Sequence, residues 1–488
     1  MLVDSRQGAM RHRFLWGAVV AALLGSLAGL PSCSWVATVD RMECTQASDC
    51  TGAFGFGSAC IEDGFCSEMA PSHPRCTKTF PEDLLERPDK YRDAIVFGTV
   101  FNRSVEKHAA RERSAELAVS EANRKSGLDG RSFGLVFCSI EERLDYDDLA
   151  SGDAALDVAN YLVHTLAVPA LIGPAGSGDT AEVFKALRGT DTLVISPSAT
   201  SPSLTALDEI NPTDKNPGLL WRTAPPDTYQ GIEIASDIAK RTFDVAVVYK
   251  QDDYGSGLTN VFQENFGENV NVVPFNDTSE IPAIAQSIGS SDVSEVLFVA
   301  NEEDVVAFLR AAAQNPGFEN KYIFLTDTAG TQGVIDETKE ATSLYERIKG
   351  TRPAPPDGAV FNTFKGAYAA RYDADVTEHT YTANTYDATW LAMYASAWAL
   401  LQEGAVTGKF MSYGLRRISD TNKTGTDDIA PRSWDGIVNS LRAGQDINVR
   451  GASGPLDYDT NEETWAPFEF WRFVLNDSGE YEVQPVTD

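Results

Sequence analysis

The pattern that most constrains this chain begins at Asp93, where short β-branched or aromatic runs alternate with helical periods. An amphipathic helical pattern covers residues 105–127. Apolar strand patterns flank it and recur after it, at residues 94–101, 133–140, 168–174 and 192–198. Alternation of this kind predicts parallel strands joined by right-handed crossovers, and therefore a doubly wound α/β sheet.

The same alternation restarts after residues 221–231, which we interpret as a segment that crosses to a second unit. A Pro/Gly-rich stretch at residues 351–360 marks another crossing, and residues 382–402 predict a long helix with one face packed on a sheet. Strand patterns in this second unit occupy residues 244–250, 295–300 and 322–327. The sequence therefore predicts two α/β units of related design.

Composition limits the partners of this chain. Its length of 488 residues suits two or three domains, and 43% hydrophobic residues are enough to form their cores. The net charge of −31 argues against nucleic acid, because a phosphate backbone would be repelled by such a surface.

The N-terminus has the pattern of an export signal. Arg11 and Arg13 precede an apolar run at residues 14–30, which is too short for a confident membrane span. Residues 30–33, Leu-Pro-Ser-Cys, resemble a bacterial lipobox, although Pro31 departs from the usual residue at its position. We therefore expect a signal peptide at residues 1–32 and lipidation of Cys33.

The remaining cysteines predict disulfides, since their number is even and the chain is expected to be exported. Four of them share a Gly-rich segment with too few apolar residues to form a core, so that segment needs cross-links. The other two are left to pair with each other. A metal site is the alternative for the four, but they lack the C-x2-C spacing of zinc ligands. The six cysteines are Cys44, Cys50, Cys60, Cys66, Cys76 and Cys138.

Enzyme signatures are mostly absent from the sequence. No serine has the flanking glycines of a nucleophile elbow, and neither a P-loop nor a dinucleotide fingerprint occurs. His73, His108, His164 and His379 stand singly and without the spacing of a local metal motif. We therefore predict no catalytic activity, no cofactor and no metal, and we keep a hydrolase only as a distant alternative.

Small polar residues follow two neighbouring strand patterns. Ser177 stands at the predicted start of a helix, where unsatisfied backbone N–H groups and the helix dipole favour an anion. Ser198 and Thr200 follow the next strand. An ordinary turn explains either stretch taken alone, but together the two loops could surround a carboxylate.

Six ordered motifs carry a resemblance to a known family: residues 172–187, 194–205, 221–231, 245–258, 381–390 and 451–459. In this order the chain resembles the leucine/isoleucine/valine-binding protein family. These are type I periplasmic solute-binding proteins, related to the extracellular ligand-binding regions of several receptors. The resemblance covers the chain from about Asp93 to its C-terminus.

The resemblance implies two doubly wound parallel-sheet lobes joined by three crossing strands, which close on a ligand about a hinge. A small disulfide-rich module precedes them. The expected divisions are 1–32 for the signal peptide, 33–92 for the anchor linker and Cys-rich module, 93–223 with 352–457 for lobe 1, and 224–351 with 458–488 for lobe 2.

The resemblance also implies ligand contacts. The loops that match Ser177 and Ser198, Ala199 and Thr200 would hold a carboxylate, and Tyr254 would line the second lobe. Asp327 is the nearest match to the acid that takes an ammonium group, with Thr326 and Thr328 as competitors within one residue. Glu302 is another acid expected at the cleft. For Phe101 core packing is the expected role, with a place in the cleft wall as the alternative.

We therefore expect an exported lipoprotein that captures a small polar ligand, an amino acid or related carboxylate, between its lobes. An ABC transporter permease is the expected partner if the protein serves uptake, and sensing is the other use. We expect a lipid-anchored location on the periplasmic face of a bacterial membrane, the outer membrane in preference to the inner, with release into the periplasm as the alternative. The rival hypothesis is a non-transport envelope lipoprotein that uses the same fold for regulatory protein–protein interaction.

Overall fold

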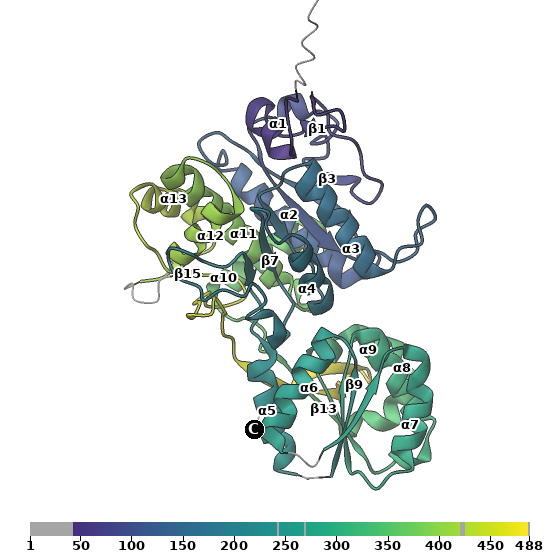
Figure 1. Ribbon diagram of the computed structural model, residues 1–488. Helices are drawn as coiled ribbons and strands as arrows, with labels where there is room; N and C mark the ends of the chain where they lie inside the picture. The colour runs from purple at the N-terminus through teal and green to yellow at the C-terminus, as the bar shows by residue number, and fades with distance from the viewer. Residues whose placement is uncertain (1–41, 242–243, 268–269, 420–424, 487–488) are drawn as a thin grey trace, which may run out of the picture. The chain divides into compact units, whose positions relative to one another are not determined.

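The computed structural model describes residues 42–241, 244–267, 270–419 and 425–486 (Figure 1). The predicted signal peptide and Cys33 lie outside these ranges. Within them, no helix is both long enough and apolar enough to cross a membrane.

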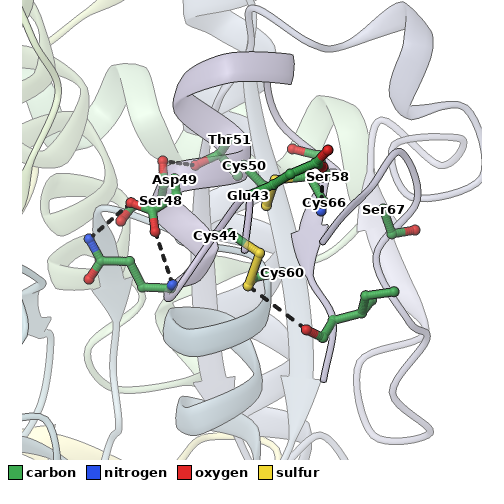
Figure 2. The surroundings of a disulfide bond; sticks show 12 residues. Glu43, Cys44, Ser48, Asp49, Cys50, Thr51, Ser58, Cys60, Cys66 and Ser67 are labelled. Carbon is green, nitrogen blue, oxygen red and sulfur yellow. Dashed lines mark hydrogen bonds between the residues drawn. A yellow bond between two sulfur atoms is a disulfide. The ribbon is translucent and has the colours of Figure 1, made fainter. Parts of the chain in front are cut away.

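Disulfides hold the N-terminal module together. Its elements are one helix, α1 (Ala47–Phe54), and two short antiparallel strands, β1 (Ala59–Cys60) and β2 (Cys66–Ser67). The bridge Cys50–Cys66 links helix α1 to strand β2, and the bridge Cys44–Cys60 links the residues just before α1 to strand β1 (Figure 2). All four cysteines of the segment form disulfides, so none of them is a free thiolate that could bind a metal. The disulfide prediction is therefore confirmed.

A third bridge, Cys76–Cys138, joins the end of this module to the first large sheet. Cys138 lies in the second strand of the predicted alternation, so the pairing of the two leftover cysteines is also confirmed. Strand β3 (Lys78–Phe80) follows Cys76 directly and pairs antiparallel with that same strand, so the sheet already begins at residue 78.

The first lobe is built on a six-stranded sheet in the order β3-β5-β4-β6-β7-β8, parallel except for β3. Its parallel strands are β4 (Ile95–Phe101), β5 (Phe133–Ser139), β6 (Ala170–Ile172), β7 (Leu193–Ser196) and β8 (Leu220–Arg222). All their residues are buried, because helices cover both faces.

Alternate side chains of one strand show the two faces. Phe97 and Phe101 pack with helices α2 (Glu106–Asn123) and α11 (Thr382–Trp398). Val96 and Val100 pack on the opposite face, with helices α3 (Ser151–Asn160) and α4 (Ser177–Ala186). This is the doubly wound arrangement that the alternation predicts.

The second lobe has a seven-stranded sheet in the order β10-β9-β11-β12-β13-β16-β17. The first five strands are parallel, and β16 and β17 are antiparallel to their neighbours. The strands are β9 (Val245–Lys250), β10 (Asn271–Phe275), β11 (Glu295–Val299), β12 (Tyr322–Leu325), β13 (Ile348–Pro353), β16 (Phe468–Leu475) and β17 (Tyr481–Pro485).

Helices cover both faces of this sheet as well (Figure 1). Ala246 and Val248 of β9 pack against one set of helices, and Val245 and Val247 pack against the other. The first set contains α7 (Ile281–Gly289), α8 (Glu302–Ala313) and α9 (Gln332–Glu337). The second contains α5 (Asp227–Ala239) and α6 (Asp253–Phe266).

The chain passes between the two sheets three times: after β8, after β13 and before β16. After the second passage it forms α10 (Ala359–Tyr372), α11, α12 (Gly408–Arg417) and α13 (Trp434–Arg442), with a minor strand pair, β14 (Asp427–Asp428) and β15 (Val449–Arg450). Helix α11 is buried along its whole length, because α2, α12 and α13 pack on it in addition to the sheet.

Candidate functional site

The two hydroxyl-rich loops of the first lobe are joined to each other. Ser196 donates to the carbonyl of Pro174 at 2.6 Å, and Ser198 donates to the carbonyl of Ala175 at 3.0 Å. In the other direction, the hydroxyl of Ser177 accepts a hydrogen bond from the backbone N–H of Ser201 at 3.1 Å. The hydroxyls therefore replace water between two strand-end loops, which explains why the stretch after β7 is so rich in serine and threonine.

Thr200 connects this loop to the start of α5. Its hydroxyl donates to the Asp227 carboxyl at 2.8 Å, and the Asp227 backbone N–H donates to the Thr200 carbonyl at 2.8 Å. Asp227 is fully buried, and this burial raises the pKa of its carboxyl well above the ordinary range, with the charge of Asp327 acting in the same direction. Ala199 is buried, and its carbonyl accepts from Arg222 at 3.2 Å.

The predicted residues of the second lobe meet at the end of β12. Tyr254, in the first turn of α6, donates to Asp327 Oδ1 at 2.7 Å and lies 2.9 Å from the hydroxyl of Thr326. The side chain of Thr328 instead donates to the carbonyl of Ala300 at 2.7 Å. Tyr254 therefore approaches both Asp327 and Thr326, and of these two only Asp327 carries a carboxylate; it is 3% exposed.

Tyr381, which the sequence analysis did not single out, also contacts the candidate residues. Its hydroxyl donates to Asp327 Oδ2 at 2.7 Å, so each oxygen of that carboxylate receives one tyrosine hydroxyl. Tyr381 precedes α11 and has φ of 63°, a left-handed conformation that is uncommon for a residue with a side chain. Such strain is concentrated at functional positions. Burial and the neighbouring Asp327 raise the pKa of its phenol well above the usual value, so it stays a donor.

The second unexpected residue is Arg111 on α2. It is 4% exposed, and its guanidinium donates to the hydroxyl of Ser198 at 3.1 Å and to the carbonyl of Thr380 at 3.2 Å. The guanidinium carbon lies 5.4 Å from the centre of the Tyr381 ring. Burial lowers the pKa of Arg111 to about 10, which leaves it charged at neutral pH.

Glu302 and Phe101 make none of the contacts just described around Asp327 and Tyr381. Glu302 begins α8 and accepts from Lys107 Nζ at 2.6 Å, an ion pair that joins the second lobe to α2 of the first. A further bond between the lobes runs from the hydroxyl of Ser201 to the carbonyl of Asp253, at 2.7 Å. Phe101 is completely buried in the core of the first lobe, which favours the packing role for it.

A buried cation and a buried carboxylate thus contact the same aromatic side chain, the cation over its ring and the carboxylate at its hydroxyl. Arg111 contacts the ring of Tyr381, and Asp327 contacts its hydroxyl. Gln230 adds a polar link, since its amide, in the orientation that pairs donors with acceptors, donates to Asp227 Oδ1 at 2.9 Å and accepts from the Asp327 backbone N–H at 3.3 Å. A separated pair of opposite charges is complementary to a zwitterion.

Comparisons with known proteins agree on one family. Residues 110–472 match the model of the receptor family ligand binding region. The Leu/Ile/Val-binding protein of Escherichia coli strain K12 is 30% identical over 274 residues, which cover 51% of this chain and 70% of that protein. The chemotactic signal transduction system substrate-binding protein BasB of Halobacterium salinarum is 23% identical over 354 residues, or 72% of this chain and 78% of that one.

A solved structure shows the same fold. The solute-binding protein of an ABC transporter from R. palustris, in complex with benzoate, superposes with a TM-score of 0.58 at 17% identity and covers 81% of this chain and 98% of its own.

Proposed function

The chain belongs to the leucine/isoleucine/valine-binding protein family of type I periplasmic solute-binding proteins, and from this premise we propose that it captures a small carboxylate-bearing ligand, most simply an amino acid. The observation that carries the proposal is that Arg111 and Asp327 both contact Tyr381, the first over its ring and the second at its hydroxyl. A ligand with one carboxylate and one ammonium group neutralises both buried charges at once.

Ligand capture of this kind requires no covalent chemistry. Tyr254 and Asp327 come from the second lobe, whereas Ser177, Ser198 and Thr200 come from the first. We propose that the ligand lies where these groups converge and that the lobes close around it. Delivery to an ABC transporter permease and signalling are the two uses that relatives' names suggest for the captured solute.

A thermal-shift screen of the purified protein tests the proposal. The probes are the twenty protein amino acids, benzoate and simple sugars. A ligand that binds only the folded state at about 100 times its Kd adds about 2.7 kcal/mol to the free energy of unfolding. That corresponds to roughly 5–10 °C in the Tm of a lobe of this size.

Two substitutions in the same loop give that screen its control. Thr200→Val removes the hydroxyl that bonds Asp227 and is expected to abolish the shift. Ser203→Ala changes an exposed hydroxyl of the same loop and is expected to preserve it. Equal shifts in the two variants would exclude the Thr200 loop from the ligand site.

The proposal also includes a lipid anchor at Cys33. We propose that Cys33 is lipidated and that the protein lies on the periplasmic face of a bacterial membrane, with the outer membrane preferred. Membrane fractionation of wild type and Cys33→Ser, with mass spectrometry of the N-terminal peptide, tests this. Equal partition of the two proteins into the soluble fraction would contradict it.

The N-terminal module favours one alternative function, a regulatory envelope lipoprotein. Large apolar side chains are exposed along its short length, an arrangement that marks interaction surfaces when they are contiguous. They are Met42, Phe54, Ile61, Phe65 and Met69. A flat screen with every probe would favour this alternative over solute capture.

A further inference from the structure

Arg111 differs from the other buried arginines of the structure in having no acidic partner. Three arginines are buried among the described residues: Arg75 at 1%, Arg222 at 2% and Arg111 at 4% exposure. Arg75 pairs with Asp147, and Arg222 pairs with Glu463. Within the part of the chain that the structure describes, Arg111 forms no ion pair with a carboxylate.

The hydrogen bonds of Arg111 leave much of its capacity unused. A guanidinium has five N–H donors, and here Nε donates to Thr380 and Nη1 donates to Ser198. Within the described ranges Nη2 has no hydrogen-bond acceptor. Both acceptors in use are uncharged, so neither offsets the cost of taking a cation out of water. The chain therefore maintains a buried positive charge that no described carboxylate contacts directly.

The charges of Asp327 and Glu302 favour the charged form of Arg111 through space, but among the described residues no carboxylate pairs with it directly. Lys107, one turn earlier on α2, is committed to Glu302, and the Asp327 carboxylate is committed to two tyrosine hydroxyls. Burial holds the pKa of His108 well below its usual value, and the positive charges of Arg111 and Lys107 act in the same direction. Helix α2 thus places two cations, Lys107 and Arg111, one turn apart in a protein whose net charge is −31.

We propose that Arg111 is the residue that binds a carboxylate of the ligand, with Ser198 holding the guanidinium in place. Its parallel N–H groups match the two oxygens of a carboxylate, a geometry that a hydroxyl loop alone cannot offer. This role rests on the proposed function and adds to it. The cleft selects ligands by their carboxylate, and an uncharged analogue of the same shape is rejected.

Titration calorimetry with L-leucine, L-glutamate, benzoate and benzamide tests the assignment. Benzamide has the shape of benzoate without its charge. The variants are Arg111→Met, which keeps length without charge, and Arg111→Lys, which keeps charge without the paired N–H groups. Arg124→Gln, at the exposed end of the same helix, is the control for loss of one positive charge.

We expect wild type and Arg124→Gln to bind at least one of the three carboxylates and not benzamide. Arg111→Met is expected to lose affinity for that carboxylate by at least about 30-fold, since a buried charge pair loses one partner. The affinity of Arg111→Lys for that carboxylate is expected to lie between those of wild type and Arg111→Met. Without ligand, Arg111→Met is expected to melt no lower than wild type, because it removes an unneutralised buried charge.

The outcomes separate this inference from the proposed function. If wild type binds a carboxylate and Arg111→Met binds it within about threefold, the role of Arg111 is wrong and solute capture stands. A fall of several degrees in the Tm of ligand-free Arg111→Met also overturns the role, because the chain itself would then need the cation. If no amino acid or aromatic carboxylate binds wild type, the proposed function fails, and this inference fails with it.

Discussion

Arg222 is predicted to be the main anchor of the loop that carries Ser198 and Thr200. All five of its N–H donors are used: two bond Glu463, and the others bond the carbonyls of Ala199 and Ser201 and the hydroxyl of Thr205. The side chains of Arg222 and Glu463 are 2% and 8% exposed. Removing one partner from such a pair leaves an uncompensated buried charge and costs about 3–5 kcal/mol.

Arg222→Met is therefore expected to lower the free energy of unfolding by about 3–5 kcal/mol in urea titrations followed by tryptophan fluorescence. The double variant Arg222→Met/Glu463→Leu is expected to recover part of that loss, because it removes both charges. Arg188→Gln breaks an exposed pair with Glu209 and is expected to cost less than about 1 kcal/mol.

A loss below about 1 kcal/mol in Arg222→Met would refute this reasoning, because the pair would then behave like an exposed one. A double variant less stable than either single variant would also refute it. The same variant tests the connection to the site: without its anchor, the loop around Thr200 is expected to bind ligand more weakly.

Three further results are expected. Replacing both Cys76 and Cys138 by alanine lowers the free energy of unfolding by about 4 kcal/mol, because their separation of 62 residues closes a long loop in the unfolded chain; urea titration measures this. Burial raises the pKa of Asp387 to about 7, so the folded protein keeps a proton that the unfolded chain releases above about pH 4. Its stability therefore falls as pH rises from about 4 to about 7, and Asp387→Asn shows a shallower slope in urea midpoints across that range, whereas an unchanged slope would contradict the raised pKa. Lys107→Gln removes the ion pair with Glu302, whose side chains are 21% and 24% exposed, and calorimetry is expected to show a rise of roughly two- to fivefold in ligand Kd with little change in stability.

The strands that the sequence predicted well are those buried on both faces. In β4 and β5 every residue is buried, so each appears in the sequence as a continuous apolar run between helical patterns. Strand β10 was missed, because it lies at the edge of its sheet, its residues are mostly partly or fully exposed, and Pro274 interrupts the pattern. An edge strand with one polar face leaves a weak signal.

The candidate site residues Ser177, Ser198, Thr200, Tyr254 and Asp327 were proposed from motif order and from polar residues at strand ends, and their role in binding stays a prediction. The structure shows that Ser177 and Ser198 also join the two loops. The motifs do not predict these hydrogen bonds between the two loops.

Arg111 and Tyr381 were missed for a physical reason. Arg111 lies in a helix rich in charged residues, where a solvent-facing position is the ordinary expectation, and its contact with Ser198 spans 87 positions in the sequence. Tyr381 lies inside one of the family motifs, but its role depends on the left-handed backbone that directs it to Asp327. Tertiary packing decides both, and a single sequence does not reveal it.

The most direct test of the account is a calorimetric titration of wild type and Asp327→Asn with the amino acid that gives the largest thermal shift. One binding site per chain is expected in the wild type. In Asp327→Asn the Kd is expected to rise at least about tenfold, because the ammonium group loses its buried carboxylate. Absence of stoichiometric binding in the wild type, or equal affinity in the two proteins, would contradict the claim that this cleft captures a zwitterion.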